Sequence, residues 1–299
     1  GDRAGARTLA KTVAARPIDG LPGLGERALG RVQALPAAPP ADGSRTSREA
    51  ASDVPAAPPA TADDSPSSLT RIDGPDLPHL AFNGWCGLRV ARRAGFEVPP
   101  FALADDGRRL VVERFDGPPG ARLGYEDFCS LQGLGARQRY EGAAEQLVSA
   151  AAAFSAPVRR TAVRRELYRR IAFAQLLGNG DAHLKTYGVL YADAADVRLA
   201  PLHDAVSTRA YPALADDVPP LTLAGRRAWR AKPGTWRRFG AHCALSDREC
   251  ESIFQWLAQA VHAELDALAR EVAAPERAAF LERLRAQWLA GIDDLRAGW

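Results

Sequence analysis

The sequence predicts an α+β protein in which a small lobe of strands and one helix precedes a larger, mostly helical lobe. Short strand patterns gather before residue 116, and helical patterns with apolar residues at three- and four-residue intervals dominate after it. Strands and helices do not alternate, which argues against a doubly wound sheet. The 299 residues, 46% of them hydrophobic and 25% charged, are enough to bury a substantial core.

The composition changes along the chain and divides it into parts. Short helical patterns occur at 8–15 and 25–35. The segment that follows is rich in alanine, proline, serine and aspartate, so it cannot bury enough apolar surface to become ordered. We therefore expect a partial N-terminal subdomain, a flexible segment, a small lobe and a large helical lobe, at residues 1–35, 36–68, 69–118 and 119–299.

In the small lobe, apolar periodicity predicts a helix over 80–94 that stops at Gly95, because glycine is typical of helix ends. Strand patterns follow at 101–103 and 109–115, separated by an Asp-Gly step that is typical of a hairpin turn. The large lobe is predicted to contain two helices, two short strands and a final pair of long helices: 143–154 and 160–177; 187–191 and 197–199; and 247–299, broken at Ala274-Pro275.

Composition also limits the partners. A net charge of +3 gives no reason to expect direct DNA contact. The longest uncharged, largely apolar run, residues 147–157, is too short to span a bilayer, so no membrane association is expected. Four cysteines without metal-ligand spacing predict buried free thiols and a cytoplasmic location. Since the sequence contains no methionine, we expect the native start to be missing from it.

Residues 176–186 concentrate polar side chains at the end of an apolar helical pattern. Asp181, His183 and Lys185 lie in a glycine-flanked loop before a short strand, where rigid elements can position catalytic groups. Asp204 follows the next strand pattern. One aspartate can act as a base toward a hydroxyl while the other holds Mg²⁺. The alternative, that these acidic residues only cap a turn and start a helix, stays open on spacing alone.

Five segments give a further signal: LRVARRAGFEVP at 88–99, VERFD at 112–116, YEDF at 125–128, GNGDAHLK at 178–185 and LAPLHDAVST at 199–208. In order and spacing they resemble the HipA-like serine/threonine kinases, best known as toxins of bacterial toxin–antitoxin pairs. The resemblance implies a two-lobed protein-kinase-like fold that uses ATP and Mg²⁺. It covers most of residues 80–212.

The resemblance implies roles for residues of the segment at 178–185. Asp181 matches the family's catalytic aspartate, which orients or deprotonates the attacking hydroxyl. Asn179 and His183 would shape the catalytic loop. Lys185 would lie near the transferring phosphoryl group and the nucleotide.

Other matches imply a nucleotide and metal site. Asp204 matches the aspartate that presents Mg²⁺ to the phosphates. Thr186 occupies the place of an asparagine that helps to hold metal, and its hydroxyl is a shorter and weaker ligand. Glu113 would lie near the interlobe hinge, and Phe115 would follow the strand over the adenine. An ordinary surface position at the strand end remains an equal alternative for Glu113.

The small lobe departs from the family pattern. Kinase-type transfer uses a strand lysine to bind the phosphates, often paired with a helix glutamate. Of the 39 basic residues only Lys11, Lys185 and Lys232 are lysines, so none lies in the expected strand. Arg71 is nearest the lysine's place and keeps its charge, although a guanidinium is no simple substitute for an ammonium. Gly84 stands near the place of the glutamate.

Two departures concern the phosphate loop and the metal loop. The family's phosphate loop has one weak candidate at 42–47, in which Ser44 and Ser47 are candidate self-phosphorylation sites, with an ordinary flexible linker as the alternative. His203 stands where the family usually has tyrosine before the metal aspartate.

These observations support an ATP- and Mg²⁺-dependent serine/threonine kinase. The resemblance implies a toxin that phosphorylates a translation component such as an aminoacyl-tRNA synthetase, arrests growth and pairs with a helix-turn-helix antitoxin. Two alternatives remain: a weak or inactive kinase-like module that regulates or binds an antitoxin, and a small-molecule phosphotransferase. A pocket rich in polar groups in the helical lobe would favour the last.

Overall fold

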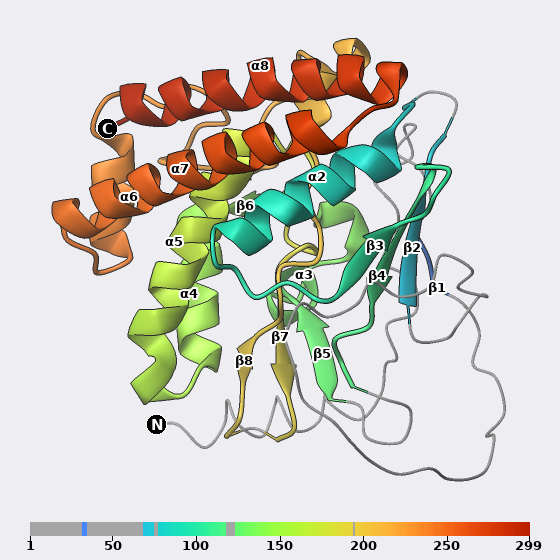
Figure 1. Ribbon diagram of the computed structural model, residues 1–299. Coiled ribbons are helices and arrows are strands. Elements are labelled where there is room, and N and C mark those ends of the chain that lie inside the picture. Colours follow the sequence, from blue (N-terminus) through green and yellow to red (C-terminus); the bar gives the residue numbers. More distant parts are fainter. Residues whose placement is uncertain (1–31, 35–67, 75–76, 118–122, 194) are drawn as a thin grey trace, which may run out of the picture.

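The computed structural model describes residues 32–34, 68–74, 77–117, 123–193 and 195–299. The predicted α+β class is confirmed: strands and one helix lie at one side of the molecule, and long helices form the rest (Figure 1). The helical pattern at 8–15, the candidate phosphate loop with Ser44 and Ser47, and all of the predicted flexible segment except Ser68 lie outside the described residues. The division into four parts remains a prediction.

The small-lobe sheet is antiparallel, with strand order β1-β2-β4-β3. Its strands are β1 (Val32–Ala34), β2 (Ser68–Ile72), β3 (Phe101–Leu103) and β4 (Arg109–Glu113). The predicted β3–β4 hairpin is confirmed, because the Gly107 N–H donates to Ala104 O at 2.7 Å across the turn. In β2, Arg71 pairs with Leu110 of β4, which places the predicted lysine substitute in the centre of the sheet.

One prediction in this region is wrong. Residues 25–35 carry a helical pattern, but Val32–Ala34 form strand β1 against β2. The backbone hydrogen bonds that β2 offers outweigh the local preference of three residues, and such pairing cannot be read from a short periodicity.

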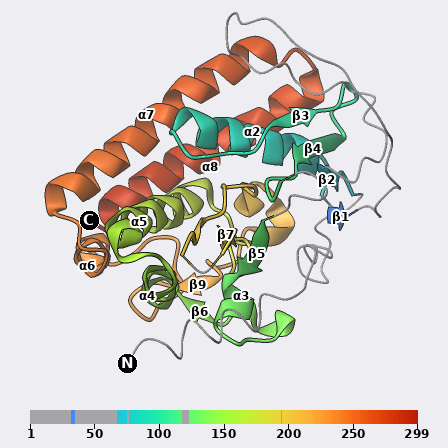
Figure 2. The ribbon, with the colours of Figure 1, turned by 90° about the horizontal axis from the view of Figure 1, so that it is seen from below.

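Helix α2 (Leu80–Arg93) begins where Asp73 supplies its cap. The Asp73 carboxylate accepts hydrogen bonds from the backbone N–H groups of His79 and Ala81, at 3.0 and 2.7 Å. This satisfies donors that a helix start leaves unpaired. The helix packs against β4 and β3 on one side and α7 on another, as the view from below also shows (Figure 2). It therefore joins the sheet to the helical lobe.

The large lobe is built around α5 (Arg160–Leu177), which has the predicted bounds and packs between α4 and α8. The other helices are α3 (Phe128–Leu131), α4 (Ala144–Phe154), α6 (Thr235–His242), α7 (Asp247–Glu271) and α8 (Pro275–Ala297). The predicted break between the last two helices is confirmed, because α8 starts at Pro275. The Ser246–Glu249 capping box fixes the start of α7.

Two small sheets lie below the helices. One has the order β5-β7-β8, from Gly124–Asp127, Gly188–Tyr191 and Arg198–Leu199. The other pairs β6 (Gly142–Ala143) with β9 (Leu221–Thr222). The sequence predicted β7 and β8 to within one residue. It missed β5, β6, β9, α3 and α6, because their runs are too short for a periodicity.

Two predictions from composition can be compared with this fold. All four cysteines are buried and free, as expected. No helix among the described residues has the length and apolar character needed to cross a membrane.

Candidate active site

The loop after α5 holds the first predicted group of residues. Gly178 ends the helix with φ of 66°, a conformation that glycine adopts without strain. The Thr208 hydroxyl accepts from the Gly180 N–H at 2.7 Å and donates to Gly178 O at 3.0 Å. The Asn179 side chain accepts from the Asp181 N–H at 3.0 Å. The loop backbone is thus held on both sides of the aspartate.

Asp181 is buried, at 3% exposed, and its Oδ1 accepts a hydrogen bond from the Tyr140 hydroxyl at 2.8 Å. Burial raises the pKa of Asp181 to about 8, and the negative charge of Asp204 adds to the rise. The Tyr140 hydroxyl and the positive charges of Arg71 and Arg139 lower the same pKa. In the ligand-free molecule this carboxyl therefore holds its proton at neutral pH.

His183 lies beside the aspartate without forming an ion pair. Its Nε2 is 3.8 Å from Asp181 Oδ1, beyond hydrogen-bond distance, and has no partner among the described residues. Burial lowers the pKa of His183 to about 4, so the ring is neutral. Its ring packs edge-on against Tyr140, with centroids 5.1 Å apart. His183 thus helps to shape the loop and carries no charge.

The second loop, after β8, carries Asp204 and is fastened to α2. The Asn83 side chain accepts from the Ser207 N–H at 2.9 Å and donates to Ser207 O at 3.0 Å. At Gly87 the helix approaches the loop so closely that an added Cβ would lie 2.2 Å from Ala205 O. The helix and the loop bearing Asp204 are therefore held together by direct contacts.

Arg71 reaches this loop from β2 and pairs with Asp204, with Nη2 donating to Oδ1 at 2.8 Å. The two side chains are only 7% and 16% exposed. The other terminal nitrogen, Nη1, is buried and has no partner among the described residues. It faces Gly84 of α2, where an added Cβ would lie 3.7 Å away. The structure thus brings together Arg71, Gly84 and Asp204, which are far apart in sequence.

Lys185 and Thr186 make local contacts. The Lys185 ammonium donates to Asp127 Oδ2 at 2.5 Å, and Asp127 also caps α3 by accepting from the Ser130 N–H. The Thr186 hydroxyl donates to His183 O at 2.8 Å. The charge of Lys185 is therefore already compensated by a carboxylate in the ligand-free molecule.

The two hinge candidates lie near the metal loop to different degrees. The Phe115 ring lies 4.8 Å from the ring of His203, the residue before Asp204. Glu113 ends β4, and its backbone N–H donates to Pro100 O. The structure brings Phe115 to the second loop and leaves Glu113 at the end of β4, paired with Ser68 of β2.

The residues present offer oxygen ligands for Mg²⁺. Asn179, Thr186 and Asp204 border a cavity of about 20 Å³, which is room for one water or one ion. The described residues contain no group of three or more His, Cys, Asp or Glu side chains that could hold a metal. Mg²⁺ typically uses one or two carboxylates and completes its shell with substrate phosphates and water. The donor set therefore fits Mg²⁺ bound together with a nucleotide.

Three residues of this site were not predicted from the sequence: Tyr140, Asp127 and Asn83. Tyr140 lies in a connection without a recognisable pattern, so no signal pointed to it. Asp127 and Asn83 lie in the region that resembles the family, but the sequence does not show that they contact Lys185 and Ser207. A search for polar residues on predicted apolar helix faces would have found Asn83, which is fully buried in α2.

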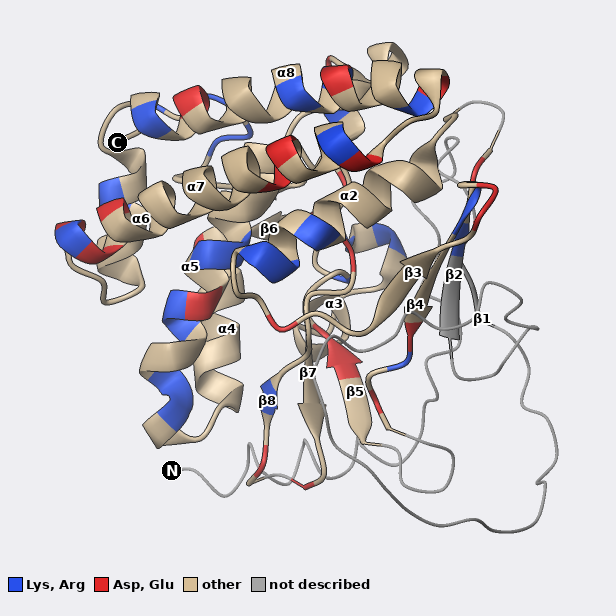
Figure 3. Ribbon diagram, in the orientation of Figure 1, with Lys and Arg blue, Asp and Glu red and all other residues tan. Residues whose placement is uncertain are grey.

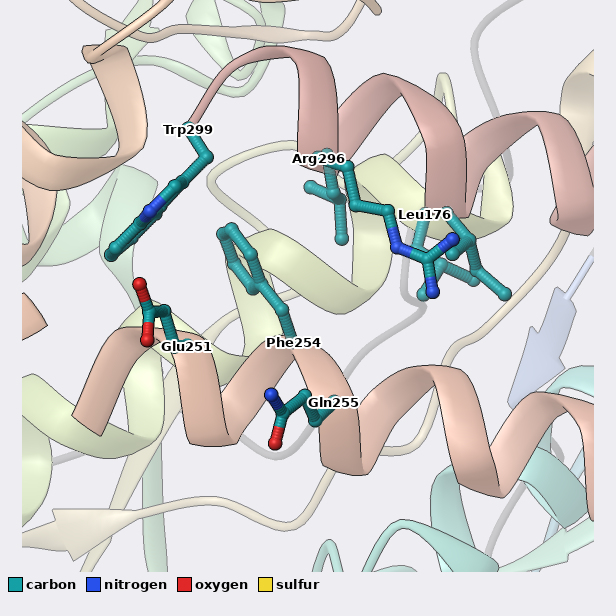
Figure 4. Close-up of a pocket in the computed structure, with 8 residues that line it drawn as sticks. Leu176, Glu251, Phe254, Gln255, Arg296 and Trp299 are labelled. Atoms are coloured by element: carbon teal, nitrogen blue, oxygen red, sulfur yellow. The ribbon is translucent and has the colours of Figure 1, made fainter. Parts of the chain in front are cut away.

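A larger cavity, of about 210 Å³, lies between α7, α8 and α5 (Figure 4). Its labelled residues are half apolar or aromatic and half polar or charged: Leu176, Phe254 and Trp299, and Glu251, Gln255 and Arg296. None of the predicted site residues borders it. It therefore does not provide the polar acceptor pocket beside Asp181 that would favour a small-molecule phosphotransferase.

The fold and this site define the class of protein as kinase-like: a strand-bearing small lobe and a helical large lobe, with two aspartate loops between them. Solved structures agree on the fold. HipA of Shewanella oneidensis, solved with HipB and operator DNA, matches with a TM-score of 0.67 at 20% identity, over 98% of this chain and 72% of that one. The Helicobacter pylori proinflammatory kinase CtkA matches with a TM-score of 0.53 at 13% identity, over 78% and 91%.

The chain belongs to the family of the HipA-like C-terminal domain, whose model matches residues 61–265. "Putative kinase Y4dM" of Sinorhizobium fredii is 29% identical over 143 residues, 43% of this chain and 34% of that protein. A "Putative kinase" of Haemophilus influenzae is 32% identical over 152 residues, 46% and 44%. The chain thus spans between a third and a half of these relatives. The predicted family and two-lobed fold are confirmed.

Proposed function

We propose that this chain is the catalytic part of an ATP- and Mg²⁺-dependent serine/threonine protein kinase. The observation that carries the proposal is the placement of Asp181 and Asp204 on two braced loops, close enough for the charge of one to raise the pKa of the other. Two acidic groups with different environments suit different roles, one for a proton and one for a metal. Arg71, the buried cation paired with Asp204, suits an anionic substrate.

In this mechanism Asp181 orients the acceptor hydroxyl through Oδ1, where the Tyr140 hydroxyl now donates. The acceptor oxygen forms a bond to the γ-phosphorus while the bond to the β,γ-bridging oxygen breaks and ADP leaves. The hydroxyl proton passes to Asp181 in its ionised form, whose share grows as the pH rises toward the pKa of about 8. Asp204, with Thr186 and Asn179, would hold Mg²⁺, and the bound ion would neutralise phosphate charge.

The remaining predicted residues bind and position. Arg71 contacts the phosphates, and Phe115 lies against the nucleotide base with Glu113 at the hinge. Lys185, paired with Asp127, holds the loop next to the transferring group, and His183 supports Asp181 from the side. These roles are proposals that rest on position and on the family's pattern.

Transfer of labelled γ-phosphate from ATP in Mg²⁺, with casein and the chain itself as acceptors, tests the proposal. Asp181→Asn keeps the size of the side chain and removes its basicity, so we expect a loss of at least about 100-fold. Asp266→Asn, an exposed carboxylate on α7, is the matched control and should keep full activity. Equal labelling by all three proteins would contradict the proposal.

The Arg71–Asp204 ion pair favours one other function, a kinase-like module with little catalysis. If the wild type binds ATP, seen as a rise in Tm, but transfers no phosphate to any acceptor, this second function holds. If the wild type neither binds ATP nor transfers phosphate, the proposed kinase and this second function are both wrong.

At the level of the whole protein, we propose a cytoplasmic toxin that phosphorylates a translation component and is paired with a helix-turn-helix antitoxin. Family membership and the likeness to HipA, which was solved with HipB and DNA, support this. Expression in a bacterial host should arrest growth for the wild type and not for Asp181→Asn. Equal growth of both strains, at equal protein levels, would contradict the toxin role.

A further inference from the structure

The acceptor side of the proposed active site already holds a hydroxyl group of this chain. Tyr140 Oη donates to Asp181 Oδ1 at 2.8 Å, which is within the distance that a general base requires from the proton it removes. The proposed mechanism places the acceptor hydroxyl at this same oxygen. The hydroxyl of Thr186, in the same loop, donates to the backbone oxygen of His183 instead. Tyr140 is thus held as a substrate hydroxyl would be.

The place proposed for the metal and the phosphates lies next to this contact. Asp181 lies between Asn179 and Ala182 in the chain. Both of these neighbours line the same cavity as Asp204. A phosphoryl group bound over this cavity would therefore be close to Asp181 and to the hydroxyl that it holds. Groups held in contact within one molecule react far faster than the same groups free in solution.

A hydrogen-bond donor without a partner lies beside the Tyr140 hydroxyl. The Lys185 N–H donates to His183 Nδ1 at 3.3 Å, which leaves the proton of the neutral ring on Nε2. That nitrogen is buried, has no partner among the described residues and is 3.8 Å from the Asp181 oxygen that Tyr140 binds. A phosphate oxygen carried by Tyr140 would be an acceptor for this N–H.

Two arginines supply positive charge at the same tyrosine. The Arg139 guanidinium lies over the Tyr140 ring, 5.6 Å from its centroid, and its buried Nε has no partner in the part of the chain that the structure describes. Arg227 donates to Tyr140 O. Lys185 is already paired with Asp127, at the acidic end of β5 (Figure 3). Because a phosphate adds about −1.5 to −2 charges and three acceptor oxygens, the two arginines would stabilise phosphotyrosine here.

We propose that Tyr140 is a self-phosphorylation site whose base is Asp181 of the same chain. The inference rests on the proposed kinase and adds an intramolecular tyrosine to the serine or threonine of its protein substrate. The Tyr140 oxygen forms a bond to the γ-phosphorus of ATP, while the bond from that phosphorus to the β,γ-bridging oxygen breaks and ADP leaves. The hydroxyl proton passes to ionised Asp181, which is then neutral and does not repel the new phosphate.

The test is the position of phosphate on the full chain after incubation with ATP and Mg²⁺, read by peptide mass spectrometry. The chain is first treated with a phosphatase, which is then removed. We expect phosphotyrosine at position 140 in the wild type, none there in Asp181→Asn, and a loss of total phosphotyrosine in Tyr140→Phe. Tyr191→Phe, which removes the hydroxyl of a β7 tyrosine, is the matched control and should be labelled like the wild type.

The rate of labelling gives a second readout. Because the base and the acceptor belong to one chain, the first-order rate constant should stay within about 2-fold over an about 10-fold range of protein concentration. A rate constant that rises in proportion to the concentration would mean that a second copy modifies Tyr140, and the inference would be wrong.

The remaining outcomes separate the two proposals. If casein is labelled while Tyr140 carries no phosphate, the inference is wrong and the proposed kinase stands. Phosphate on Tyr140 in Asp181→Asn would contradict the role of Asp181 as the base. If no acceptor is labelled at all, the proposed function fails. The wild-type chain alone locates the phosphate, so the test decides even if Tyr140→Phe does not fold.

Discussion

At the scale of single residues, the site is governed by burial. Asp181 is ionisable, 3% exposed and close to a second carboxylate, and these conditions raise its pKa to about 8. The same burial lowers the pKa of its neighbour His183 to about 4. The two side chains are therefore both uncharged at neutral pH before any ligand binds. Sequence spacing suggested that one aspartate is a base and that the other holds Mg²⁺, but it could not give the protonation of Asp181 or His183.

Asp181 makes stability depend on pH. Its pKa is raised from 3.8, so the unfolded chain loses this proton at lower pH than the folded one, and stability falls as pH rises between those values. Asp181→Asn removes this loss of stability, because asparagine does not ionise. We expect its free energy of unfolding to exceed that of the wild type by about 1–3 kcal/mol near pH 8 and by much less near pH 4, measured with urea. A constant difference across that range would contradict the assignment.

Tyr140 sets the same pKa from outside the loop. Its hydroxyl lowers the pKa of Asp181, so Tyr140→Phe should raise that pKa further. We expect the acid limb of the kcat/KM profile to move to higher pH, with a rate near neutral pH reduced by up to about 10-fold. A purely structural role of Tyr140 would lower the rate equally at every pH.

At the scale of elements, α2 and the loop bearing Asp204 form one unit. Asn83 provides two hydrogen bonds to Ser207, and Gly87 allows the helix to touch Ala205. The sequence predicted the helix from its periodicity, whereas its contact partner lies more than a hundred residues later. Such pairings depend on packing between elements, which no local pattern encodes.

Two glycines of α2 give a matched test of this contact. In Gly87→Ala the new Cβ would lie 2.2 Å from the backbone oxygen of Ala205, so helix and loop must separate. We expect a loss of about 2–4 kcal/mol in the free energy of unfolding. In Gly84→Ala the new Cβ would crowd only the movable end of Leu110, at 2.9 Å, and would meet Arg71 at the ordinary contact distance of 3.7 Å, so stability should change by less than about 1 kcal/mol. Equal effects in urea unfolding would show that Gly87 is not a contact point.

At the scale of the whole molecule, ion pairs tie α2 to α7. Glu264 of α7 is 2% exposed and accepts hydrogen bonds from both Arg89 and Arg93 of α2, and Arg89 also pairs with Glu271. The proposed small lobe is thereby anchored to the helices of the large lobe. Figures 1 and 2 show α2 and α7 side by side along this contact.

Removing the buried member of this group should weaken the whole fold. Glu264→Ala removes the buried carboxylate shared by Arg89 and Arg93 and leaves Arg89 with Glu271 alone, and we expect a loss of about 2–3 kcal/mol in the free energy of unfolding. Glu271→Ala, whose side chain is 51% exposed, should cost no more than about 1 kcal/mol. Urea unfolding of both variants decides the matter: similar losses would mean that Glu264 does not hold the elements together.

The sequence by itself determined the fold class, the long helices and the two aspartate loops. Periodicity, caps and short motifs are local, so they can be recognised without knowing which segments pack against them. The family's five segments lie in order along one chain and could be found in the same way.

Only the tertiary structure decided which charges meet. Arg71 could be placed on the lysine's strand from its position, but its pairing with Asp204 depends on β2 and the loop after β8 meeting in space. Tyr140 reaches Asp181 from a segment without any pattern, and strand β1 forms because β2 offers it a hydrogen-bonding edge. Each of these contacts joins groups that are far apart in sequence, so no local pattern predicts it. Burial then strengthens the attraction between the charges and makes unpaired backbone groups costly.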